Sequence, residues 1–336
     1  MLKKLMMVVV LLGVVAAGAL GWAYQQVKLS LEQPVVNTED ALLTVKAGTS
    51  YRGLLNQLDQ QGIVPASEWT RWIPRLEPEL VQLKTGSYLV SAEMNLRDVL
   101  ALVASGREQQ FAITLVEGDR FVDWLAQLSE APHVIHEAEG MSEADIAKAI
   151  GADVDKLEGY LLPETYHYTV GTSDLDLLKR AYQDMIALLD EAWQTRDKDI
   201  PLDNPYEALI MASIIEKETA VDDERTMVSS VFMNRLNKGM RLQTDPTVIY
   251  GMGDKYDGNI RKRDLRTPTP YNTYTIWGLP PTPIAMPSKA SVLAAVNPVD
   301  TGYYYFVADG KGGHKFSKTL TEHNRAVRAY LRTLRK

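Results

Sequence analysis

One glutamate stands out because the helix predicted around it should turn it toward the protein interior. Residues 204–207 (Asn-Pro-Tyr-Glu) have the composition of a helix start, with a capping Asn, a Pro in the first turn and an acidic third position. At about 100° per residue, Glu218 falls about 80° from Ile210, inside the apolar arc of this helix. The other members of that arc are Ala208, Met211, Ile214 and Ile215.

A carboxyl group on a buried face predicts a particular chemistry. An ionised carboxylate without partners is costly there, so the pKa of Glu218 should rise. A carboxyl group of raised pKa is what a general acid for glycoside cleavage requires. A second interpretation stays open, in which the helix ends near Lys217 and Glu218 is simply solvated.

The segment 240–300 is the second candidate for function. It is rich in Pro, Gly, Thr, Tyr and Asn, and it is long for an ordinary connection, which is typical of functional loops. Its amide, hydroxyl and phenol groups suit a neutral, hydroxylated ligand such as a sugar. The alternative is a surface loop stiffened by proline.

Other chemistries find little support. His133 and His136 have a spacing that some metal sites use, but no third ligand is evident, so no metal site is predicted. Residues 251–253 (Gly-Met-Gly) lack the third glycine of a phosphate-binding loop. Ser213 and His314 are not accompanied by the Gly-x-Ser-x-Gly turn of a hydrolase. No cofactor is expected.

Composition narrows the function classes further. The chain has 336 residues, room for about two domains. Its net charge of −7 argues against a nucleic-acid partner, which usually needs a basic face. With 46% hydrophobic and 24% charged residues it should form a packed core, and with no Cys it has neither disulfides nor a thiol nucleophile.

The N-terminus predicts a membrane anchor. Lys3 and Lys4 precede an uncharged apolar run over residues 5–24, long enough to cross a bilayer. The two lysines should keep the tail 1–4 in the cytoplasm, so that the rest of the chain is exported. A cleaved signal peptide is the alternative, but apolarity continues through Trp22.

The elements beyond the anchor predict an α+β protein. Residues 25–38 are polar and contain Pro34, as a tether would. Residues 39–109 alternate strand patterns (42–46 and 86–90) with helical ones, and so form a small α+β module. The remainder, 110–336, mixes strands near 111–116 and 303–307 with helices over about 174–193, 205–218, 223–238 and from 321 onward.

Several blocks together resemble the YceG-like (MltG) family, the membrane-bound endolytic murein (lytic) transglycosylases. They are residues 157–166 (LEGYLLPETY), 212–219 (ASIIEKET), 242–247, 271–274, 278–281, 305–307 and 313–316. The similarity runs from the anchor to about residue 330. One departure is Ala-Met-Pro-Ser at 285–288, where the family pattern has a Gly after the Pro.

The resemblance implies a fold and an activity. It implies a single N-terminal transmembrane helix, a LysM-like subdomain at 39–109 and a larger mixed α+β catalytic domain at 110–336. The implied activity is that of a lyase that cuts nascent peptidoglycan strands between N-acetylmuramic acid (MurNAc) and N-acetylglucosamine (GlcNAc), leaving a 1,6-anhydro-MurNAc end. The family's catalytic Glu falls on Glu218. Together with composition, the family blocks make five residues candidates for glycan contacts: Gln243, Asp245, Tyr271, Asn272 and Tyr274.

The resemblance also implies a place in the cell. The catalytic domain would lie in the periplasm, held at the inner membrane with its N-terminus cytoplasmic, where cutting would end strand elongation. Peptidoglycan strands are the expected partner, and peptidoglycan synthases (penicillin-binding proteins) are further candidates. Two alternatives stay open: a noncatalytic, membrane-anchored scaffold that binds peptidoglycan, and a muramidase-type hydrolase with the same fold.

Overall fold

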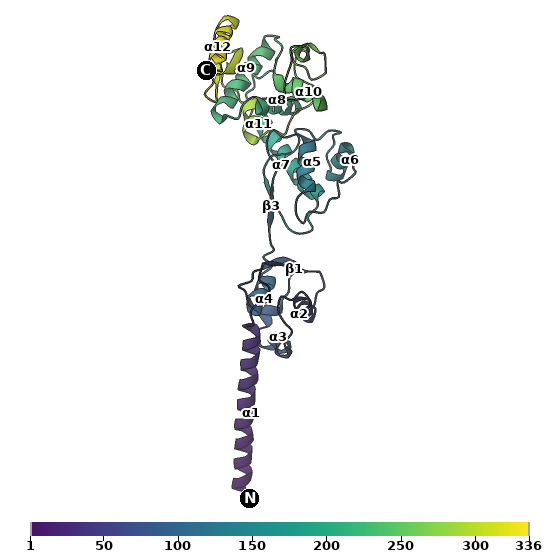
Figure 1. Cartoon of the computed structure of the whole chain (residues 1–336), viewed down its shortest axis with the longest axis vertical. Coiled ribbons are helices and arrows are strands. Elements are labelled where there is room, and N and C mark those ends of the chain that lie inside the picture. The colour runs from purple at the N-terminus through teal and green to yellow at the C-terminus, as the bar shows by residue number, and fades with distance from the viewer. Residues whose placement is uncertain (1, 335–336) are drawn as a thin grey trace. The chain divides into compact units, whose positions relative to one another are not determined.

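The computed structural model describes residues 2–334, which form two compact units of mixed α and β structure (Figure 1). Unit 1 contains the chain up to Phe111 together with Tyr168–Val170, and unit 2 contains Ala112–His167 and the chain from Gly171 onward. The strands form three two-stranded sheets, β1–β2, β3–β4 and β5–β6. The α+β class expected from the sequence is confirmed.

The chain begins with the long helix α1 (Leu2–Leu31). Among the described residues it is the one helix long and apolar enough to cross a membrane, as a membrane anchor or a signal sequence would be. The structure differs from the expected tether at 25–38, because the helix continues to Leu31. Val27 and Leu31 are apolar and are buried in the core of unit 1, which extends the helix into that unit.

Unit 1 is built around one antiparallel pair of strands. β1 (Ala41–Val45) pairs with β2 (Gly86–Val90), with Ala41 opposite Val90. Three of the helical segments between and after these strands are capped by a side chain, such as that of Asn95, which accepts from the backbone N–H of Asp98. The segments between and after the strands are α2 (Tyr51–Gln60), η1 (Glu68–Trp72), α3 (Ile73–Leu76), η2 (Pro78–Val81) and α4 (Leu96–Ser105).

Unit 2 contains a mainly helical core around α8 (Pro205–Glu218). Ala208 to Ile215 of this helix are all buried. Four helices contact α8: α7, α9, α10 (Asp245–Met252) and α11. The elements that lead to and surround α8 are β3 (Phe111–Thr114), α5 (Phe121–Ser129), α6 (Glu143–Ile150), β4 (Thr165–Tyr168), α7 (Asp174–Gln194), η3 (Asp222–Glu224), α9 (Arg225–Asn237) and α11 (Lys289–Val296).

The segment 240–300 is more ordered than the sequence suggests. It contains α10 (Asp245–Met252), η4 (Gly253–Lys255) and η5 (Asp264–Arg266) before α11. The Asp-Pro pair that opens α10 is a helix start, since Pro suits the first turn and an acidic residue is favourable there. A helix of only eight residues among glycines and prolines gives too short a periodic pattern to detect.

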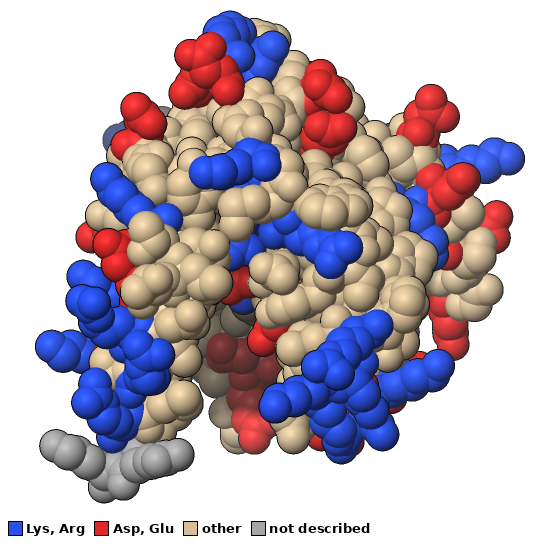
Figure 2. All heavy atoms as spheres, turned by 90° about the horizontal axis from the view of Figure 1, so that it is seen from above, with Lys and Arg blue, Asp and Glu red and all other residues tan. Residues whose placement is uncertain are grey.

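The chain closes with a hairpin and an amphipathic helix. β5 (Tyr305–Ala308) pairs antiparallel with β6 (His314–Ser317), and α12 (Leu320–Thr333) packs against this hairpin. Figure 2 shows one face of the molecule, on which Lys and Arg side chains gather in patches between acidic and uncharged residues. No residue of α12 is fully buried, although the helix is strongly amphipathic.

Candidate active site

Helix α8 places Glu218 at its C-terminal end, beside a cleft. The side chain of Asn204 accepts from the backbone N–H of Glu207 at 3.0 Å, and Pro205 occupies the first turn, so the helix begins where the sequence predicts. The helix runs through Glu218 and ends at Thr219, whose N–H still donates to the carbonyl of Ile215 at 3.2 Å. The last helical residue is thus Glu218, one residue beyond Lys217.

The carboxyl group of Glu218 is enclosed although the residue as a whole is half-buried. Its pKa is raised to about 7, mainly by burial and in smaller part by the neighbouring charge of Asp245. The hydroxyl of Thr244 donates a hydrogen bond to Glu218 Oε1 and opposes this rise, as do the positive charges of His314 and Arg235. Near neutral pH the group thus populates both its protonated and its ionised form.

Glu216, two residues earlier, shows what a structural carboxylate looks like. Its side chain is buried too, which the helical periodicity did not predict. Its Oε1 lies 3.6 Å from Arg225 Nη2, and its Oε2 accepts from the backbone N–H of Ser288 at 2.8 Å, at the start of α11. Glu216 is thus neutralised and holds two helices together. Glu218, by contrast, lacks an ion-pair partner among the residues that the structure describes and lines a cleft.

Asp245 and Tyr274 form a second polar pair in the cleft. The phenol of Tyr274 donates to Asp245 Oδ1 at 2.6 Å, so the aspartate is held at the start of α10. Burial and the neighbouring carboxylates raise the pKa of Tyr274, which keeps the phenol protonated. The bond holds Asp245 beside Glu218, where the charge of Asp245 raises the pKa of Glu218.

The backbone between α9 and α10 is held in an unusual conformation. Gln243 has a φ of 53°, a left-handed conformation that is costly for a residue other than glycine. Thr273 holds this conformation through two hydrogen bonds. The N–H of Gln243 donates to the carbonyl of Thr273, and the N–H of Thr244 donates to Thr273 Oγ1 at 3.0 Å. This strained turn positions the Thr244 hydroxyl on Glu218.

Arg235, on α9, is a cleft residue that the sequence analysis missed. It is only 7% exposed, and its guanidinium donates to three backbone carbonyls, those of Tyr304, Arg241 and Leu242. No carboxylate lies within ion-pair distance of it in residues 2–334. Burial lowers its pKa, and the field of Glu218 counteracts that effect. Nothing in the local sequence separates this arginine from an exposed helical one.

These groups line a cleft of about 340 Å³. Besides Glu218, its polar lining comes from Arg235, Gln243, Asp245, Tyr274 and His323, and the rest is aromatic and aliphatic. The lining residues are Glu218, Phe232, Arg235, Leu242, Gln243, Asp245, Tyr274, Tyr305, Phe306, Leu320 and His323. Aromatic rings beside hydrogen-bonding groups form a surface suited to sugar rings.

Two of the residues expected to contact the glycan lie outside this cleft. Asn272 is 1% exposed, and its amide nitrogen donates to the carbonyls of Asp264 and Thr267, so this residue stabilises the loop from within. Tyr271 packs against Tyr250 with ring centroids 4.9 Å apart and hydrogen-bonds to Thr282. Neither lines the cleft, whereas Glu218, Gln243, Asp245 and Tyr274 come together there.

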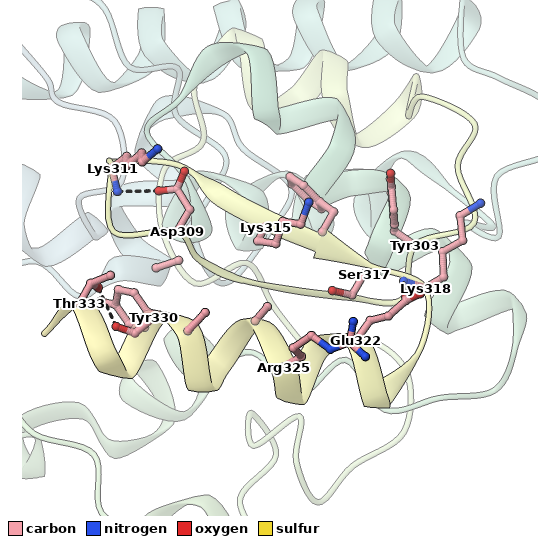
Figure 3. Close-up of a pocket in the computed structure, with 14 residues that line it drawn as sticks. Tyr303, Asp309, Lys311, Lys315, Ser317, Lys318, Glu322, Arg325, Tyr330 and Thr333 are labelled. Atoms are coloured by element: carbon pink, nitrogen blue, oxygen red, sulfur yellow. Dashed lines mark hydrogen bonds between the residues drawn. The ribbon is translucent and has the colours of Figure 1, made fainter.

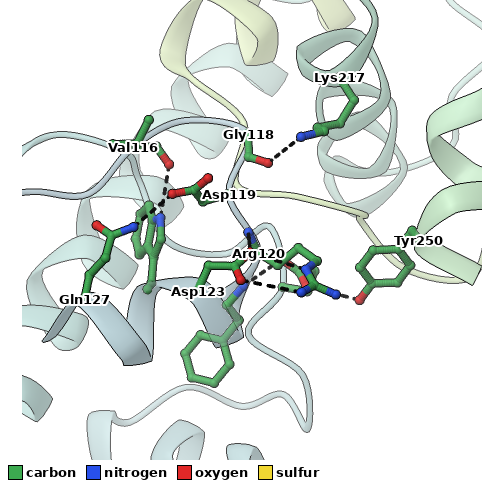
Figure 4. Close-up of polar contacts among 11 residues, drawn as sticks. Val116, Gly118, Asp119, Arg120, Asp123, Gln127, Lys217 and Tyr250 are labelled. Carbon is green, nitrogen blue, oxygen red and sulfur yellow. Dashed lines mark hydrogen bonds and ion pairs between the residues drawn. The ribbon is translucent and has the colours of Figure 1, made fainter. Parts of the chain in front are cut away.

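A set of polar contacts behind the cleft fixes α8 and α10 (Figure 4). Lys217 Nζ donates to the carbonyl of Gly118 at 2.9 Å, which ties the end of α8 to the loop before α5. Tyr250, on α10, donates to Glu158 Oε2 at 3.1 Å, and the N–H of Phe121 donates to Glu158 Oε1 at 3.1 Å. Burial raises the pKa of Glu158 to about 7 despite these two bonds.

We expect Tyr250→Phe to weaken this support without touching the cleft. The variant leaves a buried oxygen of Glu158 with one donor fewer, which should cost about 1–2 kcal/mol of unfolding free energy. Denaturant unfolding of the full chain in detergent, compared with the wild type, measures the loss. Tyr256→Phe, on a half-buried tyrosine of the same region for which the structure gives no side-chain hydrogen bond, serves as the control. Equal stability of both variants and the wild type would contradict the structural role.

Within residues 2–334 no three or more His, Asp or Glu side chains are grouped so that they could hold a metal ion. The acid–base chemistry available in the cleft is that of a single half-protonated carboxyl group with polar neighbours.

Comparisons with known proteins identify relatives of this chain. A Bacillus subtilis (strain 168) protein named endolytic murein transglycosylase is 29% identical over 90% of this chain and 88% of its own length. A Streptococcus pneumoniae protein of the same name is 32% identical over 51% of this chain and 32% of its own length. The crystal structure of a yceG-like protein from Listeria monocytogenes matches with a TM-score of 0.52 and 28% identity, covering 86% of this chain and 99% of that one. The model of the YceG-like family matches residues 43–329, and the chain belongs to that family.

Proposed function

We propose that this chain is an endolytic murein transglycosylase, a lyase that cuts peptidoglycan strands between MurNAc and GlcNAc. One observation carries the chemistry: the carboxyl group of Glu218 lies enclosed in a cleft with a pKa of about 7. The family and the name of the Bacillus subtilis relative support the substrate class. A noncatalytic scaffold would have no need of a buried, unpaired carboxyl group.

The reaction needs one acid–base group. Protonated Glu218 donates its proton to the glycosidic oxygen while the bond from that oxygen to C1 of MurNAc breaks. The resulting carboxylate takes the proton of the 6-hydroxyl of the same MurNAc, and O6 bonds to C1. This step returns the proton to Glu218 and consumes no water. Because the nucleophile belongs to the substrate, the ring itself supplies the proximity.

The products distinguish this lyase from a hydrolase. Asp245 is a second carboxylate beside Glu218, so a muramidase-type reaction with an activated water is the alternative. Digestion of purified glycan strands by the full chain, followed by mass spectrometry, should give 1,6-anhydro-MurNAc ends. Reducing MurNAc ends would instead identify a hydrolase, and uncut strands a scaffold.

We infer that Gln243, Asp245 and Tyr274 contact the glycan, since they line the cleft with Glu218. Tyr271 and Asn272 would act on these three only indirectly, through the loop they support. Tyr274→Phe keeps the ring and removes the hydroxyl that holds Asp245. We expect a several-fold higher KM with an unchanged melting temperature, and an unchanged KM would speak against a glycan contact.

We further propose the arrangement of the whole chain. Residues 5–24 of α1 would cross the inner membrane from a cytoplasmic tail at 1–4, with the catalytic domain, 110–336, in the periplasm. The apolar surface and length of α1 and the lysines at its start support this topology. Residues 39–109 would be a LysM-like subdomain, a proposal supported by the order of strands and helices between β1 and β2.

A membrane tether would restrict the enzyme to glycan close to the membrane. An endolytic enzyme confined to the membrane would cut nascent strands and so end their elongation, with peptidoglycan synthases (penicillin-binding proteins) as candidate partners. Deletion of the gene should lengthen glycan strands, as measured by chromatography of strands released by amidase. Strand lengths equal to those of the parent would contradict this role.

A further inference from the structure

A second cleft, larger than the catalytic one, lies between the β5–β6 hairpin and α12 (Figure 3). Its volume is about 690 Å³. Strand β6 contributes Lys315 and Ser317, and α12 contributes Arg325 and Tyr330 from the opposite wall (Figure 3). Nothing in the mechanism above uses this cleft.

The cleft is basic in a chain whose net charge is −7. Four cationic side chains line it: Lys311, Lys315, Lys318 and Arg325. All four are exposed, and none of them forms an ion pair with an acidic side chain in residues 2–334. Arg328 and Arg332 extend the charge along α12.

The two acidic residues of the cleft already accept hydrogen bonds from the protein backbone. Asp309 accepts from the backbone N–H groups of Lys311 and Gly313, and Glu322 accepts from those of Lys318 and Thr319. These bonds hold the pKa of each carboxyl group below its usual range. The carboxylates cap a turn and a helix, so they leave the four cations free for an anionic ligand.

The same elements border the catalytic cleft. Strand β5 contributes Phe306 to the catalytic cleft and Ala308 to the basic one, while α12 contributes His323 to the first and Arg325 to the second. From Glu322 to Thr333, α12 rises about 16 Å, which equals the reach of about five extended residues. The basic cleft therefore has the length of a short peptide, and the same strand and helix contribute residues to both clefts.

We infer that the basic cleft binds the acidic peptide that MurNAc carries on its lactyl group, while the glycan occupies the catalytic cleft. This inference rests on the proposed function. Carboxylates of the peptide pair with Lys315 and Arg325, and its side chains contact the rings of Tyr303 and Tyr330. A sugar polymer without peptides would leave this cleft empty, so the cleft favours strands that still bear their peptides.

The test compares two substrates, glycan strands with their peptides and the same strands after amidase treatment. The enzyme is the full chain in detergent, as wild type and as the double variant Lys315→Gln/Arg325→Gln. We expect the double variant to raise KM about tenfold on peptide-bearing strands, with kcat unchanged and with no change on stripped strands. High salt should raise the wild-type KM in the same substrate-dependent way.

The control is Lys262→Gln/Arg266→Gln, which removes the same charge from two exposed residues that line neither cleft. It should leave both KM values unchanged. Equal KM values of wild type and double variant on both substrates overturn the inference but leave the proposed function intact. Failure of the wild type to cut either substrate overturns the proposed function itself.

An anionic bilayer is the competing ligand, since α12 also exposes Leu320 and Leu331. The same variants are therefore compared in vesicles of phosphatidylcholine and of phosphatidylglycerol. An effect of the double variant that follows lipid charge rather than the presence of peptides assigns the surface to the membrane and overturns the inference.

Discussion

Glu218→Gln should lower the rate of glycan cleavage by about a thousandfold, the range in which a single acid–base group contributes. Glutamine keeps the size of the side chain and can still accept from Thr244, so the cleft keeps its shape. It cannot donate a proton to the glycosidic oxygen or remove one from the 6-hydroxyl. The measurement is the initial rate of formation of 1,6-anhydro-MurNAc ends, with Glu207→Gln, in the first turn of α8 and outside the cleft, as the control.

The same variant has a stability signature that separates catalysis from folding. The pKa of Glu218 is about 7 in the folded chain against an ordinary value of 4.5, so the folded state binds this proton more tightly than the unfolded state. This contribution favours folding most strongly below pH 4.5 and declines as the pH rises to about 7. Glutamine does not titrate, so its melting temperature relative to the wild type should be higher at about pH 8 than at about pH 4. If the melting temperatures of variant and wild type differ by the same amount at both pH values, folding does not raise the pKa of Glu218.

The position of Glu218 could be predicted because it depends on local periodicity. Once Asn204 and Pro205 fix the start of α8, the register of Ile210 and Ile214 fixes the direction of every later side chain. The same periodicity places Glu216 outside the apolar arc of α8, yet its side chain is buried. Its burial depends on Arg225 and Ser288, which approach from other helices. Helical periodicity does not reveal partners that are distant in sequence.

The rest of the cleft depends on tertiary contacts that leave no mark on the sequence. Asn272 and Tyr274 are both polar residues of one loop, yet one holds the loop together and the other faces the cleft. Arg235 looks like an ordinary helical arginine, and its burial arises from the carbonyls of residues 241, 242 and 304. Composition made the loop a candidate for function, but only the fold separates the side chains that line the cleft from those that support the loop.

The pH dependence of kcat/KM should follow the protonation of Glu218, and this is the second large effect. Cleavage begins with proton donation, so activity should fall about tenfold per pH unit once the carboxyl group ionises. The fall should start near its pKa of about 7. Asp245→Asn removes a negative charge that raises this pKa, so in that variant the fall should start at lower pH.

Thr244→Val should move the same limb in the opposite direction. The threonine hydroxyl stabilises the ionised carboxylate, so its removal raises the pKa of Glu218 and extends activity to higher pH. Initial rates between about pH 5 and pH 9 on peptide-free strands measure all three proteins without a contribution from the basic cleft. Opposite shifts in the two variants require that both residues act through the charge of one carboxyl group, because a general loss of structure would lower the rate at every pH. A limb that starts at the same pH in all three proteins would show that a group other than Glu218 donates the proton.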